Sequence, residues 1–120
     1  MMRDFKTLGI WQRSVKLAKT INDLTQSFPA CEKFGLAVQM NRSGVSIASN
    51  IAEGCGRRTI ADQTYFIHVA IGSSYELETQ IEIAFLSHYI SASIYQSTVS
   101  ELNTLQKMMV GYVRGLGVRY

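Results

Sequence analysis

A row of polar residues between positions 39 and 57 has the residue types and spacing that most suggest chemistry in this sequence. Its members follow one another at steps of three and four residues: Gln39, Arg42, Ser46, Asn50, Glu53 and Arg57. On an α-helix this spacing places the side chains on one face. Glu53 precedes Arg57 by four residues, which is the favourable order for a helical ion pair.

The polar row runs beside a core-facing apolar stripe, so its groups need hydrogen-bond partners. The stripe consists of Leu36, Met40, Ile47 and Ile51. We expect Ser73, Glu76 and Gln80, farther along the chain, to lie near the row. Two interpretations stay open. The residues form a polar network within the protein or a subunit contact, or they form a recognition surface.

Six cations in the first half of the chain are candidates for binding nucleic-acid phosphates. They are Arg13, Lys16, Lys19, Arg42, Arg57 and Arg58. Residues 1–60 carry nine basic and four acidic side chains, a net charge of +5, whereas residues 61–120 carry three and five, a net charge of −2. This imbalance suits a nucleic acid or another acidic partner, and it equally suits self-association of oppositely charged surfaces. The first three cations also fit a solvated face, and the last two fit a helix cap.

Metal sites and redox cysteines are not indicated by the sequence. Cys31 and Cys55 form no CxxC pair. His68 and His88 are twenty residues apart on one expected helix, which separates them by roughly 160° around its axis. We predict that the protein holds no metal and no cofactor.

Catalysis is equally unsupported. Glu78 and Glu82 share a helix face, but a dinuclear bundle site needs a Glu-x-x-His element on each of two helices, so we interpret them as a solvated acidic face. We predict no catalytic residue and no small-molecule substrate. A small enzyme that uses Glu53 or Glu76 in a cleft between subunits is the weakest alternative.

Four helical segments are expected to position these residues. They span residues 8–27, 32 or 35 to 55, 60–91 and 97–116. Pro29 marks the first link, and the glycines at 54 and 56 end the second helix in the left-handed conformation. Thr59 and Asp62 form the start of the third helix. We predict an all-α protein, a single domain over residues 1–120 folded as an antiparallel up-down-up-down four-helix bundle.

The apolar content exceeds what a lone bundle can bury. Hydrophobic residues make up 47% of the chain, and the third segment is apolar on nearly all sides. We therefore expect a homo-oligomer. No apolar run reaches the length of a membrane span, and the start of the chain is charged where a signal peptide requires apolar residues. A cytoplasmic protein without membrane contact is expected.

Two segments resemble a known family signature. SIASNIAEG at residues 46–54 and GSSYEL at residues 72–77 are similar to the 23S rRNA intervening-sequence proteins, which are small bacterial four-helix bundle proteins. The resemblance extends from Trp11 to Leu116. It implies a ring-like homopentamer and lends the chain no established catalytic site. Some members are encoded within insertions in ribosomal RNA genes, and a related branch, the accessory variability proteins of diversity-generating retroelements, partners a reverse transcriptase and binds nucleic acid.

These observations lead to two expectations of function. The first is a non-enzymatic homo-oligomeric bundle that contacts RNA or a ribonucleoprotein through its basic surface. The second is a protein-interaction scaffold, such as an accessory subunit of a reverse transcriptase, without nucleic-acid specificity of its own.

Overall fold

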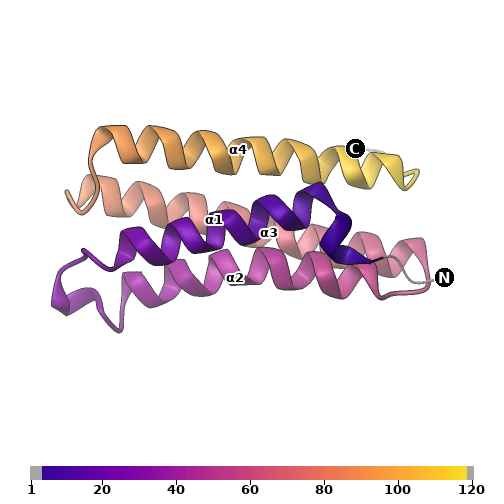
Figure 1. Cartoon of the computed structure of the whole chain (residues 1–120), viewed down its shortest axis with the longest axis horizontal. Coiled ribbons are helices and arrows are strands. Elements are labelled where there is room, and N and C mark those ends of the chain that lie inside the picture. The colour runs from indigo at the N-terminus through magenta and orange to yellow at the C-terminus, as the bar shows by residue number, and fades with distance from the viewer. Residues whose placement is uncertain (1–3, 119–120) are drawn as a thin grey trace.

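Four long helices, joined by short links, make up the protein. The structure is a computed structural model and describes residues 4–118. The helices are α1 (Gly9–Thr25), α2 (Leu36–Cys55), α3 (Ile60–Leu86) and α4 (Ala92–Gly115). Two 3-10 turns, η1 (Phe5–Thr7) and η2 (Ala30–Glu32), precede α1 and α2. Successive helices run in opposite directions (Figure 1), so the predicted all-α, up-down-up-down bundle is confirmed.

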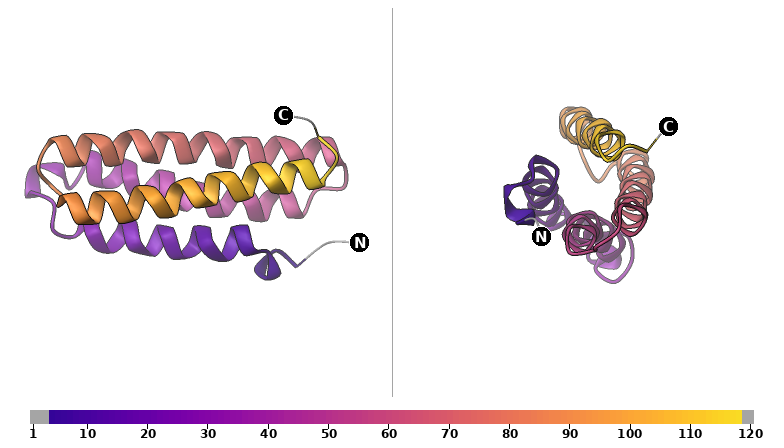
Figure 2. Two further views of the ribbon diagram at one scale, coloured as in Figure 1. Left: turned by 90° about the horizontal axis from the view of Figure 1, so that it is seen from above. Right: turned by 90° about the vertical axis from the view of Figure 1, so that its right-hand side faces the viewer.

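Helices α2 and α3 are the central pair of the bundle. In the end-on view of Figure 2, α2 lies between α1 and α3, and α3 lies between α2 and α4. The most extensive packing joins α2 to α3, and the least extensive packing between neighbouring helices joins α1 to α4. The bundle measures 46 × 23 × 20 Å. Residues on the facing sides of α2 and α3 are therefore held most firmly.

The core is built from one apolar stripe on each helix. The predicted stripe of α2 is buried throughout, and the seam of α4 is buried at Leu102, Leu105 and Met109. On α1 the buried stripe includes Leu17 and Ile21, whereas Val15 is 40% exposed. Complete burial of one such side chain contributes about 1.5–3 kcal/mol relative to leaving it in water. These stripes explain why the helices pack in this arrangement.

Side-chain caps fix the starts of two helices. The backbone N–H of Asp62 donates to Thr59 Oγ1 (3.1 Å), as the sequence predicts for α3. The N–H of Ile94 donates to Ser91 Oγ (3.1 Å) and starts α4. The prediction that the fourth helix begins near residue 97 was wrong, because α4 begins at Ala92 directly after its cap residue Ser91. Asp4 caps η1 rather than α1, whose N-cap residue is Leu8.

The ends of α2 and α3 also differ from expectation. Gly56 is right-handed (φ −84°), so α2 does not end in a left-handed glycine. Helix α3 ends at Leu86 instead of residue 91, and His88 is the residue with positive φ (63°). Tyr89 N–H donates to Ala84 O (2.9 Å) and His88 N–H to Phe85 O (3.0 Å). This is the Schellman arrangement, in which glycine usually occupies the place of His88.

No helix in the described part of the chain combines the length and the apolarity that a membrane crossing requires.

Candidate functional site

Three members of the predicted polar set form a hydrogen-bonded cluster between α2 and α3. The hydroxyl groups of Ser46 and Ser73 lie 2.9 Å apart. Asn50 donates its amide Nδ2 to the backbone oxygen of Ser46 (2.8 Å) and to its hydroxyl (3.0 Å). Ser73 is buried, and the other two are half-buried. The structure thus satisfies these groups within one subunit.

Glu53 and Arg57 form the predicted ion pair at the end of α2. Arg57 Nη2 lies 2.5 Å from Glu53 Oε1, and both side chains are about half exposed. Such surface pairs contribute about 0–1 kcal/mol. The guanidinium also lies over the Phe66 ring at 4.7 Å, and Gln63 donates to the Arg57 carbonyl (3.0 Å). Arg57 is therefore held against its own bundle.

The remaining polar residues line a hollow that we call the α2–α3 cleft, with a volume of about 330 Å³. Its walls are formed by Gln39, Arg42, Ser43, Ser46, Ser73, Glu76 and Gln80. Arg42 and Glu76 are exposed, and neither has a hydrogen-bond or ion-pair partner among residues 4–118. The Oε1 atom of Gln80 is shielded from solvent and accepts no hydrogen bond there. The cleft contains polar groups that the chain itself leaves unsatisfied.

The six candidate cations do not form one compact patch. Arg13, Lys16 and Lys19 project from the exposed side of α1, and Lys19 pairs with Asp23 (2.5 Å). Arg58 is exposed in the α2–α3 link. Arg42 lines the α2–α3 cleft and also an apolar hollow between α1 and α2 that includes Asn22 and Val45. Within the described chain, Arg13, Lys16, Arg42 and Arg58 are the candidates without an acidic partner.

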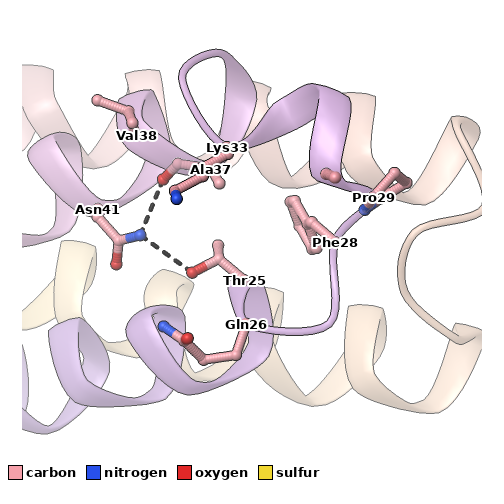
Figure 3. A pocket seen from close by; sticks show the side chains of 9 residues that line it. Thr25, Gln26, Phe28, Pro29, Lys33, Ala37, Val38 and Asn41 are labelled. Carbon is pink, nitrogen blue, oxygen red and sulfur yellow. Dashed lines mark hydrogen bonds between the residues drawn. The ribbon is translucent and has the colours of Figure 1, made fainter.

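A third hollow lies where the α1–α2 link meets the two helices (Figure 3). Its volume is about 400 Å³, and its lining includes Gln26, Lys33 and Asn41. Asn41 Nδ2 donates to Thr25 Oγ1 (3.0 Å) and to the carbonyl of Ala37 (2.8 Å). Sequence reasoning missed this hollow, because only the folded link brings residues 25–33 beside residue 41.

The predicted solvated acidic face is confirmed for Glu82, which is exposed, and is wrong for Glu78. Glu78 is half-buried and accepts hydrogen bonds from Asn103 (3.2 Å) and Gln106 (2.9 Å) of α4. Glu82 accepts the hydroxyl proton of Tyr95. This hydrogen bond is the main cause, and partial desolvation the second, of a pKa of Tyr95 above its usual value. The two carboxylates help to join α3 to α4.

Titratable groups elsewhere are spread out. His68 and His88 are both exposed, and no three potential metal-ligating side chains come together in the described residues. Cys31 is exposed and Cys55 is buried, and the two form no disulfide. The α2–α3 cleft is therefore the best candidate site.

Comparison with known proteins identifies the family. The profile described as 23S rRNA-intervening sequence protein matches residues 6–111. A search of curated proteins finds no match. A crystal structure of a protein with unknown function from the S23 ribosomal protein family of Bacteroides thetaiotaomicron superposes with a TM-score of 0.78. The two chains are 22% identical in sequence. The match covers 87% of this chain and 97% of the Bacteroides chain, which supports a shared fold. The resemblance noted in the sequence is confirmed, and the chain belongs to the 23S rRNA-intervening sequence protein family.

Proposed function

We propose that this chain is a non-enzymatic bundle that assembles with copies of itself, into the pentamer its family resemblance implies, and that the assembly binds RNA or a ribonucleoprotein. The observation that carries the assembly is the outer face of α3. Four large apolar side chains on it are 47–67% exposed: Tyr65, Tyr75, Ile83 and Leu86. They fall within roughly 80° around the helix axis. They share this arc with the exposed residues His68, Gly72 and Thr79, and we interpret the whole face as an interaction surface.

A second exposed apolar set favours a ring over a simple pair. Val15 on α1, Val45 on α2 and the link residue Phe34 are 40%, 56% and 88% exposed. A ring forms when one surface of each copy binds a different surface of the next. Two different apolar surfaces on one chain meet that requirement.

The unpaired cations support binding to a nucleic-acid backbone. Arg13, Lys16 and Arg42 lie on α1 and α2 without acidic partners in the described residues. Repetition of these cations around an assembly multiplies the phosphate contacts available to one RNA. Each phosphate neutralised by a cation releases a counterion, so affinity falls as salt rises.

A salt titration of RNA binding tests this proposal. We expect the double variant Arg13→Gln, Lys16→Gln to bind single-stranded RNA more weakly. The slope of log K against log salt should become shallower by about 1.4 for each subunit that contacts the RNA, which is about 0.7 per lost contact. Lys19→Gln is the matched control, because Asp23 already neutralises Lys19. An affinity for RNA that is absent or independent of salt contradicts the proposal.

The scaffold alternative has its own support in the exposure of Phe34. Phenylalanine is enriched in protein–protein interfaces relative to the rest of the protein surface. Under this alternative a protein partner occupies the apolar surfaces, and the cations bind no RNA. Purification from the native host with and without nuclease separates the two: a partner retained after nuclease favours the scaffold.

A further inference from the structure

The two walls of the α2–α3 cleft carry side chains of opposite charge, Arg42 on α2 and Glu76 on α3. Gln39 and Arg42 of α2 line one wall, and Glu76 and Gln80 of α3 line the other. The Ser46–Ser73 hydroxyl pair also lines the hollow between these walls. A ligand that pairs with both charged groups must offer acceptors to Arg42 and donors to Glu76.

The chain leaves these charges available. In the described structure Arg42 and Glu76 line one hollow of about 330 Å³, yet they do not pair with each other or with another residue. The Oε1 atom of Gln80 is shielded from solvent, so Arg42 and Glu76 are the charged groups of these two walls that a ligand can reach.

Guanine is the nucleobase whose edges complement both walls. Its O6 and N7 are adjacent acceptors, and an arginine binds them through two parallel hydrogen bonds. Its N1–H and N2–H are adjacent donors, and a carboxylate with two oxygens accepts both. Adenine and cytosine offer a carboxylate only their exocyclic amino group, and uracil offers only one ring N–H. Unstacked bases of single-stranded RNA are commonly recognised through these edges.

We propose that the α2–α3 cleft binds a guanine base, with Arg42 on its O6 and N7 edge and Glu76 on its N1–H and N2–H edge. For guanine within RNA this rests on the proposed function, since Arg13 and Lys16 would then bind the neighbouring phosphates. A free guanine nucleotide presents the same edges, so the experiment includes both sources.

Fluorescence anisotropy with labelled RNA nonamers tests the proposal. One nonamer carries a single central guanine among uracils, and the second carries adenine in its place. We expect the guanine nonamer to bind at least about fivefold more tightly, because one bidentate contact discriminates by about 1–3 kcal/mol. Unlabelled GMP and AMP as competitors distinguish the sources: displacement by GMP alone means that the free nucleotide also binds.

Glu76→Gln gives the sharpest variant, because its two expected effects have opposite signs. Removal of one negative charge strengthens binding of the adenine nonamer. Loss of the paired acceptors lowers the ratio of guanine-nonamer to adenine-nonamer affinity toward one. A purely structural role of Glu76 would change both affinities in the same direction. Glu101→Gln on α4 makes the same charge change away from the cleft and should keep the guanine preference.

The outcomes separate this proposal from the proposed function. Salt-dependent RNA binding without a guanine preference, or with a preference that Glu76→Gln leaves intact, overturns the guanine site alone. GMP binding without RNA binding supports the cleft and contradicts RNA as the partner. Failure of both nonamers and of GMP to bind overturns both proposals.

Discussion

The hydroxyl groups of Ser46 and Ser73 lie 2.9 Å apart and join the two central helices of the bundle. Asn50 donates to the same Ser46 hydroxyl, so three side chains share one cluster. The cluster adjoins the α2–α3 cleft, and two of its members line it. It therefore fixes the relative register of the helices that carry Arg42 and Glu76.

We predict that Ser46→Ala destabilises the protein by about 1–3 kcal/mol, because it leaves Ser73 as a buried hydroxyl without its partner. The double variant Ser46→Ala, Ser73→Ala should cost less than the sum of the two single variants, since the pair is removed together. Urea unfolding at one fixed protein concentration measures all three. Additive costs would mean that the two hydroxyls are not coupled.

Gly54 is predicted to resist substitution, because α3 passes close to it. A Cβ at this position would lie 3.0 Å from the Cβ of Phe66 and 3.2 Å from the carbonyl oxygen of Gln63. We expect Gly54→Ala to destabilise the protein by about 1–2 kcal/mol after the gain in helix propensity is included. Gly111→Ala on α4 is the matched control. Its Cβ would meet nothing within 4 Å, so thermal unfolding should show stabilisation. Equal effects of the two variants would contradict the close approach.

The left-handed backbone of His88 offers a stabilising substitution. A residue with a Cβ at positive φ destabilises the folded state by about 1–2 kcal/mol, and glycine relieves this strain. Part of the relief is offset, because glycine loses more conformational entropy on folding. We predict that His88→Gly raises Tm by roughly 2–4 °C. Ser87→Gly is the control, because Ser87 has a φ of −84° and gains nothing from glycine. A lower Tm for His88→Gly would show that the imidazole contributes more than the strain costs.

The sequence predicted the helices well where all residues of a cap or an apolar stripe lie within one short segment. Thr59 and Asp62 marked the start of α3, and the apolar spacing on α2 identified its buried side. The start of α4 was misplaced, because serine is common both in links and at helix N-caps, and the sequence alone does not distinguish these roles for Ser91. The end of α3 was misplaced because His88, not a glycine, adopts the left-handed conformation.

The site was less predictable from sequence than the helices. The spacing placed Ser46, Asn50, Glu53 and Arg57 on one side of α2, but it could not indicate which of them pair locally. Nor could it reveal that α4 side chains would engage Glu78, because that contact joins residues 25 to 28 positions apart. The hollow beside Asn41 depends on the path of the α1–α2 link, which the sequence leaves undetermined.

The outer face of α3 is predicted to hold the assembly together. We expect the double variant Ile83→Lys, Leu86→Lys to dissociate into folded single chains, because two buried lysines without partners are costly in an interface. Both positions lie near the carboxyl end of α3, where positive charge suits the helix dipole, so the bundle itself should stay helical by circular dichroism. Thr104→Lys adds a cation to the exposed side of α4 and serves as the control.

The mass of the unmodified protein in solution tests the central claim most directly. Sedimentation velocity at micromolar concentration should give a multiple of the 13.4-kDa chain, about 67 kDa for a ring of five. A compact species of 13.4 kDa across that concentration range would contradict the account, because Tyr65, Tyr75, Ile83 and Leu86 would then remain exposed in the native protein.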